Sequence, residues 1–169
     1  ALLLNVEPGA DTAIDGKALA NAEMVVTLSP FKTNLDISDV LLPIAPFSET
    51  SGSFVNAEGR LQSFHAVVKP LGETRPAWKV LRVLGNLLGL VGFAKESSQD
   101  MLAQVLPGVA HGEFVSAARL SNRTSAAIDT ATAAAKPCVA SIYQLDALVR
   151  RAGSLQLTAD ALAASEVSA

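Results

Sequence analysis

The stretch from residue 38 to residue 62 restricts the fold more than any other part of this sequence. Its first segment, S-D-V-L-L-P at residues 38–43, predicts a short strand that proline closes, because proline has no N–H for the ladder. Its second segment, E-T-S-G-S-F-V-N-A-E-G-R-L-Q at residues 49–62, alternates around a turn at residues 56–59. This turn predicts a β-hairpin in which Gly59 adopts a left-handed backbone conformation.

Three continuous apolar runs, at residues 1–6, 24–28 and 40–42, predict buried strands. Turn-rich segments separate these runs, and strands that alternate with crossovers are typical of a parallel sheet in an α/β fold. Because the crossovers are short, we expect the outer part of a doubly wound, mainly parallel sheet. The hairpin and C-terminal helices are added to this sheet.

Two helices are expected after the hairpin. Residues 78–91 are apolar on almost every face, which predicts a helix that is buried except along one polar strip. Thr74 is its expected N-cap and Gly92 its expected end. Residues 96–106 predict a second, amphipathic helix.

The tail of the chain predicts a short strand at residues 139–143 and a helix at residues 146–152. Asp146 and Arg150 are one helical turn apart, so we expect them to form an ion pair. Gly153 is the expected C-cap of this helix.

Residues 121–136 are rich in alanine, serine and threonine and lack the apolar bulk that burial requires, so they predict a linker or a marginal helix. Residues from Thr158 onward are expected to fray. The predicted organisation is an α/β domain over residues 1–115, a linker over residues 116–137 and a strand–helix tail over residues 138–169.

The composition excludes several classes of function. The net charge of −3 and the lack of a basic stripe argue against nucleic-acid binding. The single cysteine, Cys138, rules out a disulfide framework and a four-thiolate cluster within these residues. His65 and His111 do not have zinc-ligand spacing. The sequence has neither a phosphate-binding P-loop nor a G-x-S-x-G nucleophile motif. We therefore predict no catalytic, cofactor-binding or metal-binding side chain.

Glu49, Glu58 and Arg60 are the charged residues of the hairpin region. One interpretation makes the carboxylates an acid or a base. The favoured interpretation is structural, with Glu58 and Arg60 satisfying backbone groups and each other, because buried charges must be paired. It predicts that Arg60 is largely buried and hydrogen-bonded to a carboxylate or to backbone carbonyls.

No segment predicts a membrane span. The best candidate, residues 80–94, is interrupted by Arg82 and Asn86, and it would reach about 22 Å of the ~30 Å hydrocarbon core. The chain begins inside an apolar run without methionine, so we expect a C-terminal piece of a longer protein. Half of its residues are hydrophobic and 17% are charged. This composition favours burial against partners, and dimerisation of the excised piece would not be surprising.

The two segments at residues 38–43 and 49–62 together resemble a signature of the molybdopterin-oxidoreductase superfamily, and P-L-G-E-T-R-P-A-W at residues 70–78 continues the resemblance. The tail I-Y-Q-L-D-A-L-V-R-R-A, residues 142–152, is similar to the molybdopterin-oxidoreductase-like iron–sulfur subunit of bacterial NADH:quinone oxidoreductase, respiratory complex I. The signature positions, all given a structural role, are Asp39, Pro43, Glu49, Gly52, Asn56, Glu58, Gly59, Arg60 and Gln62.

This resemblance implies a scaffold portion of that iron–sulfur subunit, within a complex that transfers electrons from NADH to quinone and translocates protons. It implies iron–sulfur clusters bound by cysteines in an N-terminal part that these residues do not include, and no cofactor in this fragment. The implied partners are the other subunits of the peripheral arm, on the cytoplasmic side of the bacterial inner membrane.

Two alternatives stay open. The first is the C-terminal part of a catalytic molybdopterin oxidoreductase that uses molybdenum or tungsten, such as a formate dehydrogenase. Such enzymes usually follow the hairpin with a β-barrel domain, whereas this sequence predicts helices and an alanine-rich linker. The second is a free-standing α/β binding module.

Overall fold

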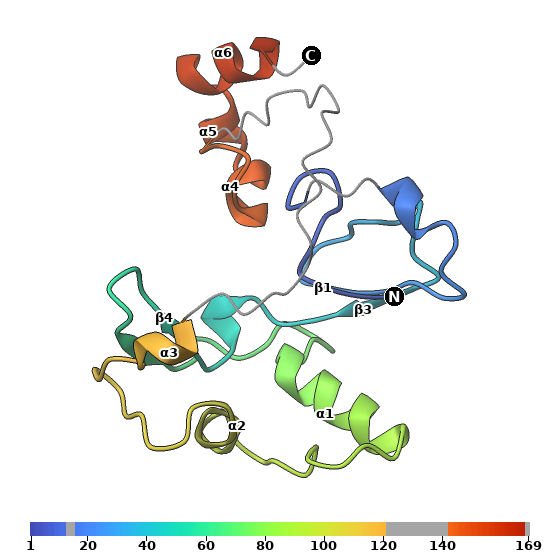
Figure 1. The fold of residues 1–169 in the computed structure, drawn as a ribbon. Coiled ribbons are helices and arrows are strands. Elements are labelled where there is room, and N and C mark those ends of the chain that lie inside the picture. Colours follow the sequence, from blue (N-terminus) through green and yellow to red (C-terminus); the bar gives the residue numbers. More distant parts are fainter. Residues whose placement is uncertain (13–15, 121–141, 168–169) are drawn as a thin grey trace, which may run out of the picture. The chain divides into compact units, whose positions relative to one another are not determined.

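The computed structural model describes residues 1–12, 16–120 and 142–167 (Figure 1). The chain divides into two compact units. Unit 1 comprises residues 1–5 and the described residues of 22–124. Unit 2 comprises the described residues of 6–21 and 125–169.

Unit 1 contains a three-stranded parallel sheet in the order β1-β2-β3, with strands β1 (Leu2–Leu4), β2 (Val26–Ser29) and β3 (Val40–Pro43). Val26 of β2 is in register with Leu2 on one side and with Val40 on the other. The predicted parallel sheet and the α/β character of the fold are confirmed.

The burial predicted for the outer strands is wrong for this chain. Leu2 and Leu4 of β1 are 47% and 40% exposed, and Val40 of β3 is 39% exposed. Crossover helices normally cover both faces of a parallel sheet. Between β1 and β2 the described residues form only one short 3₁₀ helix, η1 (Gly16–Leu19), and residues 30–39 form turns.

The hairpin follows the 3₁₀ helix η2 (Phe47–Glu49) and consists of β4 (Gly52–Val55) paired antiparallel with β5 (Leu61–Phe64). Gly59 has a φ of +84°, which confirms the predicted left-handed turn. Phe54 and Phe64 stack across the two strands with their ring centroids 5.3 Å apart.

Residues 111–115, which begin in a turn and form one antiparallel bridge from Phe114 to Arg60, lie against the free edge of β5. Leu61 N–H donates to the Glu113 carbonyl at 2.8 Å, and Val115 N–H donates to the Gly59 carbonyl at 2.8 Å. The short helix α3 (Ala117–Leu120) follows. Residues 111–115 therefore extend the pairing of the hairpin beyond its own two strands.

Helix α1 (Ala77–Leu87) is shorter at its C-terminal end than the sequence predicts. Thr74 does not cap it, because its hydroxyl donates to the Leu71 carbonyl at 2.7 Å and the helix begins after Pro76. The helix ends before Gly89, which has a φ of +68°, so Gly92 is not the residue that ends it.

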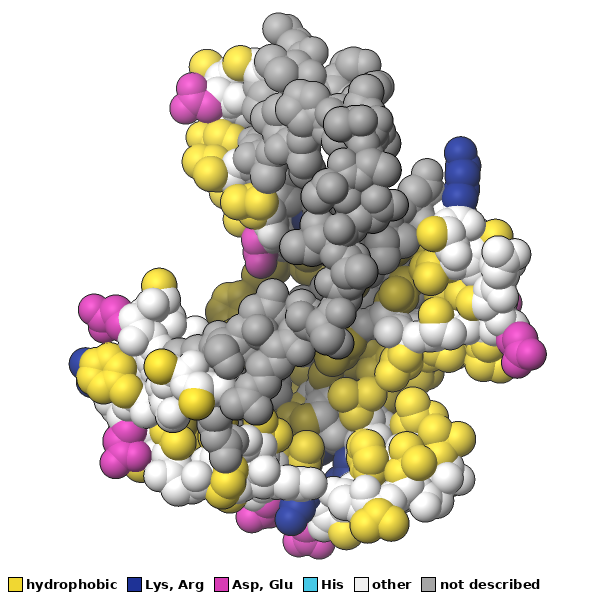
Figure 2. Space-filling view, viewed as in Figure 1, with side chains coloured by type: hydrophobic (Ala, Val, Ile, Leu, Met, Phe, Trp, Pro, Cys, Tyr) yellow, Lys and Arg dark blue, Asp and Glu magenta, His cyan; other side chains and the backbone are white. Residues whose placement is uncertain are grey.

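The predicted burial of α1 on every side except one polar strip is also wrong for this chain. Val83 and Leu87 are 50% and 80% exposed, and Figure 2 shows apolar side chains gathered on the surface over α1. Gly85 is the buried residue of the helix, because the Phe93 ring occupies the space that a Cβ would take.

The second predicted helix is present as α2 (Ser98–Val105), which begins with a capping box between Ser97 and Asp100. Val105, at the end of this helix, is 64% exposed, so it does not face inward as an amphipathic helix would require. Within the described parts of the chain, no helix has both the length and the apolar character that a membrane span requires.

Unit 2 contains the helices α4 (Ala147–Arg151), α5 (Gly153–Gln156) and α6 (Ala159–Val167). Gly153 begins α5 instead of capping α4, and α6 replaces the expected fraying. Residues 121–141, which include most of the predicted linker and of the predicted tail strand, lie outside the described residues.

The predicted Asp146–Arg150 ion pair does not form. Asp146 is the N-cap of α4, and its carboxylate accepts the Leu148 N–H at 2.8 Å. Arg150 instead donates to Asp11 at 2.8 Å and lies 3.4 Å from the Glu7 carboxylate. The Asp146 carboxylate is thus used in the N-cap of α4.

This ion-pair cluster anchors the N-terminal segment of unit 2 to α4. We expect Arg150→Gln to lower the free energy of unfolding by about 2 kcal/mol, because the Arg150 side chain is only 9% exposed and its loss leaves the carboxylates of Glu7 and Asp11 without their nearest cation. Arg151→Gln is the matched control, since Arg151 is 33% exposed. We expect Arg151→Gln to lower the free energy of unfolding, measured by urea denaturation, by less than about 1 kcal/mol. Equal effects of the two substitutions would contradict this role.

Asp11 makes the stability of unit 2 depend on pH. Partial burial raises the pKa of Asp11, but the hydrogen bond from Arg150 and further backbone and charge interactions lower it, so the net pKa lies below 3.8. The ionised form therefore stabilises the fold at neutral pH, and this contribution is lost as the pH falls below about 4 through the lowered pKa. We expect Asp11→Asn to be less stable than the parent at pH 7 and to lose less stability between pH 5 and pH 3. Parallel stability–pH curves would contradict this.

Candidate functional site

Two signature residues, Asp39 just before β3 and Pro43 at its end, fix how this strand pairs. The Asp39 carboxylate accepts the Val25 N–H at 2.7 Å, and the Asp39 N–H donates to the Val25 carbonyl at 2.9 Å. Pro43 pairs with Ser29 at the end of the strand, where its missing N–H is tolerated. Both residues act on the backbone of the sheet.

Asn56 builds the turn of the hairpin. Its side-chain oxygen accepts the N–H groups of Glu58 and Arg60 at 3.0 and 2.9 Å. An asparagine side chain that accepts backbone N–H groups in this way stabilises a tight turn. Gln62 lies in β5 opposite Phe54.

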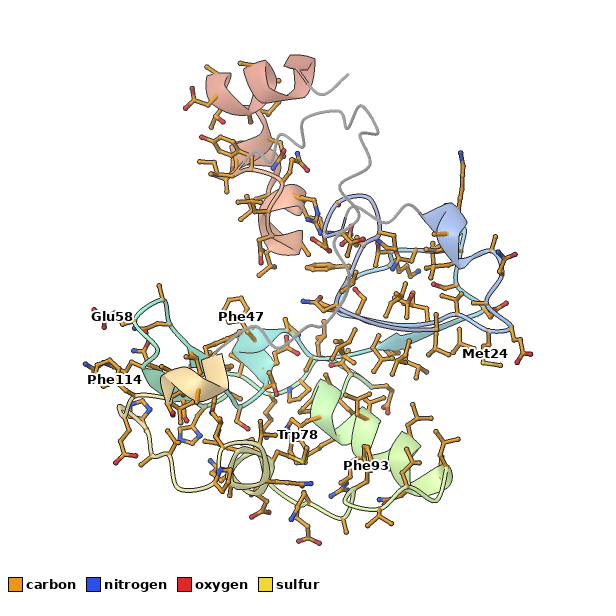
Figure 3. The ribbon with its side chains drawn as sticks, in the orientation of Figure 1. Met24, Phe47, Glu58, Trp78, Phe93 and Phe114 are labelled. Carbon is orange, nitrogen blue, oxygen red and sulfur yellow. The ribbon has the colours of Figure 1, made fainter. Side chains whose placement is uncertain are left out.

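Arg60 connects the hairpin to the segment at residues 111–115. Its guanidinium donates to the Gly112 carbonyl at 2.7 Å and lies 4.3 Å from the centre of the Phe114 ring. Figure 3 shows Glu58 and Phe114 together at the turn end of the hairpin. The predicted bond to a backbone carbonyl is confirmed. The predicted burial is not, because the Arg60 side chain is 39% exposed and Glu58 lies 3.9 Å away on the surface.

Glu49 connects the signature to the segment at residues 70–78 that continues the resemblance. Its carboxylate accepts the Leu71 N–H at 2.8 Å, and the neighbouring Ser48 carbonyl accepts the Val67 N–H at 2.9 Å. Further along, Ala45 N–H donates to the Arg75 carbonyl at 2.9 Å. Residues 45–49 are therefore held against the P-L-G-E-T-R-P-A-W segment.

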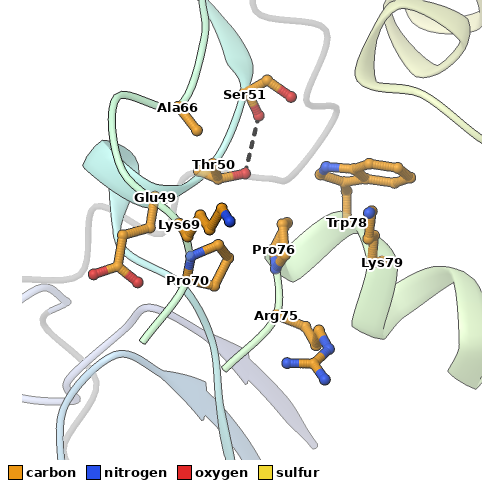
Figure 4. Close-up of a pocket in the computed structure, with 10 residues that line it drawn as sticks. All are labelled: Glu49, Thr50, Ser51, Ala66, Lys69, Pro70, Arg75, Pro76, Trp78 and Lys79. Atoms are coloured by element: carbon orange, nitrogen blue, oxygen red, sulfur yellow. Dashed lines mark hydrogen bonds between the residues drawn. The ribbon is translucent and has the colours of Figure 1, made fainter. Parts of the chain in front are cut away.

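An open pocket of about 470 Å³ lies between these two segments (Figure 4). Its charged lining residues are three cations, Lys69, Arg75 and Lys79, and a single carboxylate, Glu49. The other lining residues are Thr50, Ser51, Ala66, Pro70, Pro76 and Trp78. Glu49 is a signature residue and Trp78 belongs to the segment that continues the resemblance, but no sequence pattern indicated that the three cations lie together.

The donors in this pocket suit an anion and not a metal cation, because ammonium, guanidinium and hydroxyl groups are not the ligands that metals prefer. Among the described residues, no three His, Cys, Asp or Glu side chains gather as a metal site would require. His111 Nδ1 accepts the Ser63 N–H at 2.8 Å, which gives this histidine a structural role. Cys138 lies outside the described residues.

The sequence matches the molybdopterin oxidoreductase family over residues 2–87, from β1 to the end of α1. The chain therefore belongs to this family. The match contains the parallel sheet, the hairpin and every residue that lines the pocket.

Curated relatives in Staphylococcus aureus carry the name "Putative formate dehydrogenase". The relative in strain bovine RF122 / ET3-1 is 36% identical over 93 residues, which is 53% of this chain and 10% of the relative. The relative in strain USA300 is 36% identical over 72 residues, which is 41% of this chain and 7% of the relative. The chain thus spans about a tenth or less of the length of these relatives.

Trp78 carries an unsatisfied donor beside the pocket. Its indole nitrogen is buried and has no hydrogen-bond partner among the described residues. A buried donor without a partner costs about 1–3 kcal/mol.

We therefore expect Trp78→Phe to change the free energy of unfolding by less than about 1 kcal/mol, because the lost contact area is offset by removal of the unpaired N–H. Trp78→Ala should cost at least about 2 kcal/mol, since it also removes the aromatic ring. Chemical denaturation of the parent and both variants measures these changes in the free energy of unfolding. Equal losses would mean that the indole N–H is satisfied in solution.

Proposed function

We propose that this chain is part of a molybdenum- or tungsten-pterin oxidoreductase of the formate dehydrogenase type. The observation that carries the proposal is the likeness to formate dehydrogenases, 36% identity over 93 residues, together with the family match over residues 2–87. When bound, the pterin-held metal supplies the redox chemistry in such an enzyme. In this chain the signature side chains bind backbone groups, which supports a scaffold role.

We further propose that β1, β2 and β3 form the outer part of a larger doubly wound sheet. The partial exposure of β1 and β3 supports this, because parallel strands are normally covered on both faces. The proposed division of the whole chain is the domain at residues 1–115, the linker at residues 116–137 and the tail at residues 138–169.

A scaffold portion of the iron–sulfur subunit of NADH:quinone oxidoreductase is the second candidate. The observation that favours it is the tail at residues 142–152, whose sequence resembles that subunit and which contains helix α4. In this candidate, iron–sulfur clusters lie in another part of the polypeptide, and the partners are subunits of the peripheral arm on the cytoplasmic side of the inner membrane. The likeness to formate dehydrogenases favours the first candidate.

Metal analysis of the longer protein that contains this chain separates the two candidates. We expect molybdenum or tungsten near one atom per molecule, and reduction of an artificial dye that depends on added formate. Iron–sulfur signals in electron paramagnetic resonance without molybdenum or tungsten, together with electron transfer from NADH in the purified complex, would overturn the first candidate and support the second.

A further inference from the structure

The positive charges of the pocket are largely uncompensated. Lys69 forms no hydrogen bond or ion pair with any described residue. The Lys79 ammonium lies 5.4 Å from the centre of the Trp78 ring and also lacks an ion-pair partner in the described chain. Arg75 has a carboxylate, Glu73, at 3.4 Å. Two lysine charges therefore remain at the pocket without a counter-charge.

The acidic residue of the lining does not neutralise these lysines. The Glu49 carboxylate is occupied by the Leu71 N–H at 2.8 Å. Figure 4 shows it directed away from Trp78 and Lys79. Its single negative charge is outnumbered by the three cations of the lining, so the lining has a net positive charge.

Backbone and hydroxyl groups increase the positive potential on the same side. Helix α1 begins after Pro76, a lining residue that provides no side-chain cap, and the first N–H groups of a helix have no intrahelical acceptor. The positive end of the helix dipole therefore faces this region. The Thr50 hydroxyl, which also lines the pocket, donates to the Ser51 carbonyl at 3.1 Å and could donate to a ligand instead.

We propose that this pocket binds a phosphate group, either as the free ion or as a monoester, between Lys69 and Lys79. Two unpaired ammonium groups match the double negative charge of phosphate near neutral pH, whereas a carboxylate such as formate would neutralise only one of them. The pocket, at about 470 Å³, is larger than a bare phosphate, so the organic part of a monoester has room beside the Trp78 ring.

The intrinsic fluorescence of Trp78 offers a direct test, because the 169-residue chain contains a single tryptophan. Sodium phosphate is titrated at constant ionic strength, and a saturable change in emission is expected. Lys69→Ala and Lys79→Ala should each raise the apparent Kd up to about fivefold, since an exposed charge contact contributes up to about 1 kcal/mol. Lys32→Ala is the matched control, because Lys32 is an exposed lysine of unit 1 outside the pocket. Its Kd should equal that of the parent.

Three results would overturn the proposal. They are an emission change that stays linear in phosphate, an equal loss of affinity in Lys32→Ala, and saturation by sodium formate at lower concentration than by phosphate. Circular dichroism first establishes that each variant keeps the parent's fold, and calorimetry on the longer parent protein repeats the comparison of the lysine variants. Glycerol 3-phosphate distinguishes the two sources of phosphate, because tighter binding than free phosphate identifies a monoester as the ligand.

Discussion

Strand β2 is paired on both sides, and the structure of unit 1 depends on its burial. Thr27 and Leu28 have no exposed surface, so the Thr27 hydroxyl requires a partner inside the protein. It finds one in the Ser38 hydroxyl at 2.7 Å. The next residue, Asp39, binds the Val25 amide, and β3 then runs beside β2. The first residues of the signature are thus fixed by the hydrogen-bonding needs of the buried strand.

The same kind of interaction recurs through the rest of the signature. Asn56 satisfies two N–H groups of the turn, Arg60 binds the Gly112 carbonyl, and Glu49 binds the Leu71 amide. Each polar side chain is used on a backbone group that a sharp turn or a strand end would otherwise leave without a partner. A segment built in this way holds neighbouring elements at fixed positions.

Local features were predictable from the sequence, whereas burial and distant pairing were not. The three parallel strands and the conformation of Gly59 follow from apolar runs and turn residues. The predicted burial of β1 and α1 was wrong, because an apolar run does not show which of its faces the rest of the fold covers. The contact between Arg150 and Asp11 joins residues 139 positions apart and has no local signal. Lys69 and Lys79 come from a loop and a helix that only the fold brings to one pocket.

We propose that the signature holds the structure and does not take part in chemistry. The most direct test is the turnover of the proposed molybdenum- or tungsten-containing protein with Arg60→Met, measured per folded and metal-loaded molecule alongside its thermal unfolding. We expect a lower unfolding temperature and a turnover within about twofold of the parent. A tenfold change in turnover would correspond to about 1.36 kcal/mol in the activation free energy. A tenfold or larger loss of turnover, with the unfolding temperature and metal content unchanged, would contradict it.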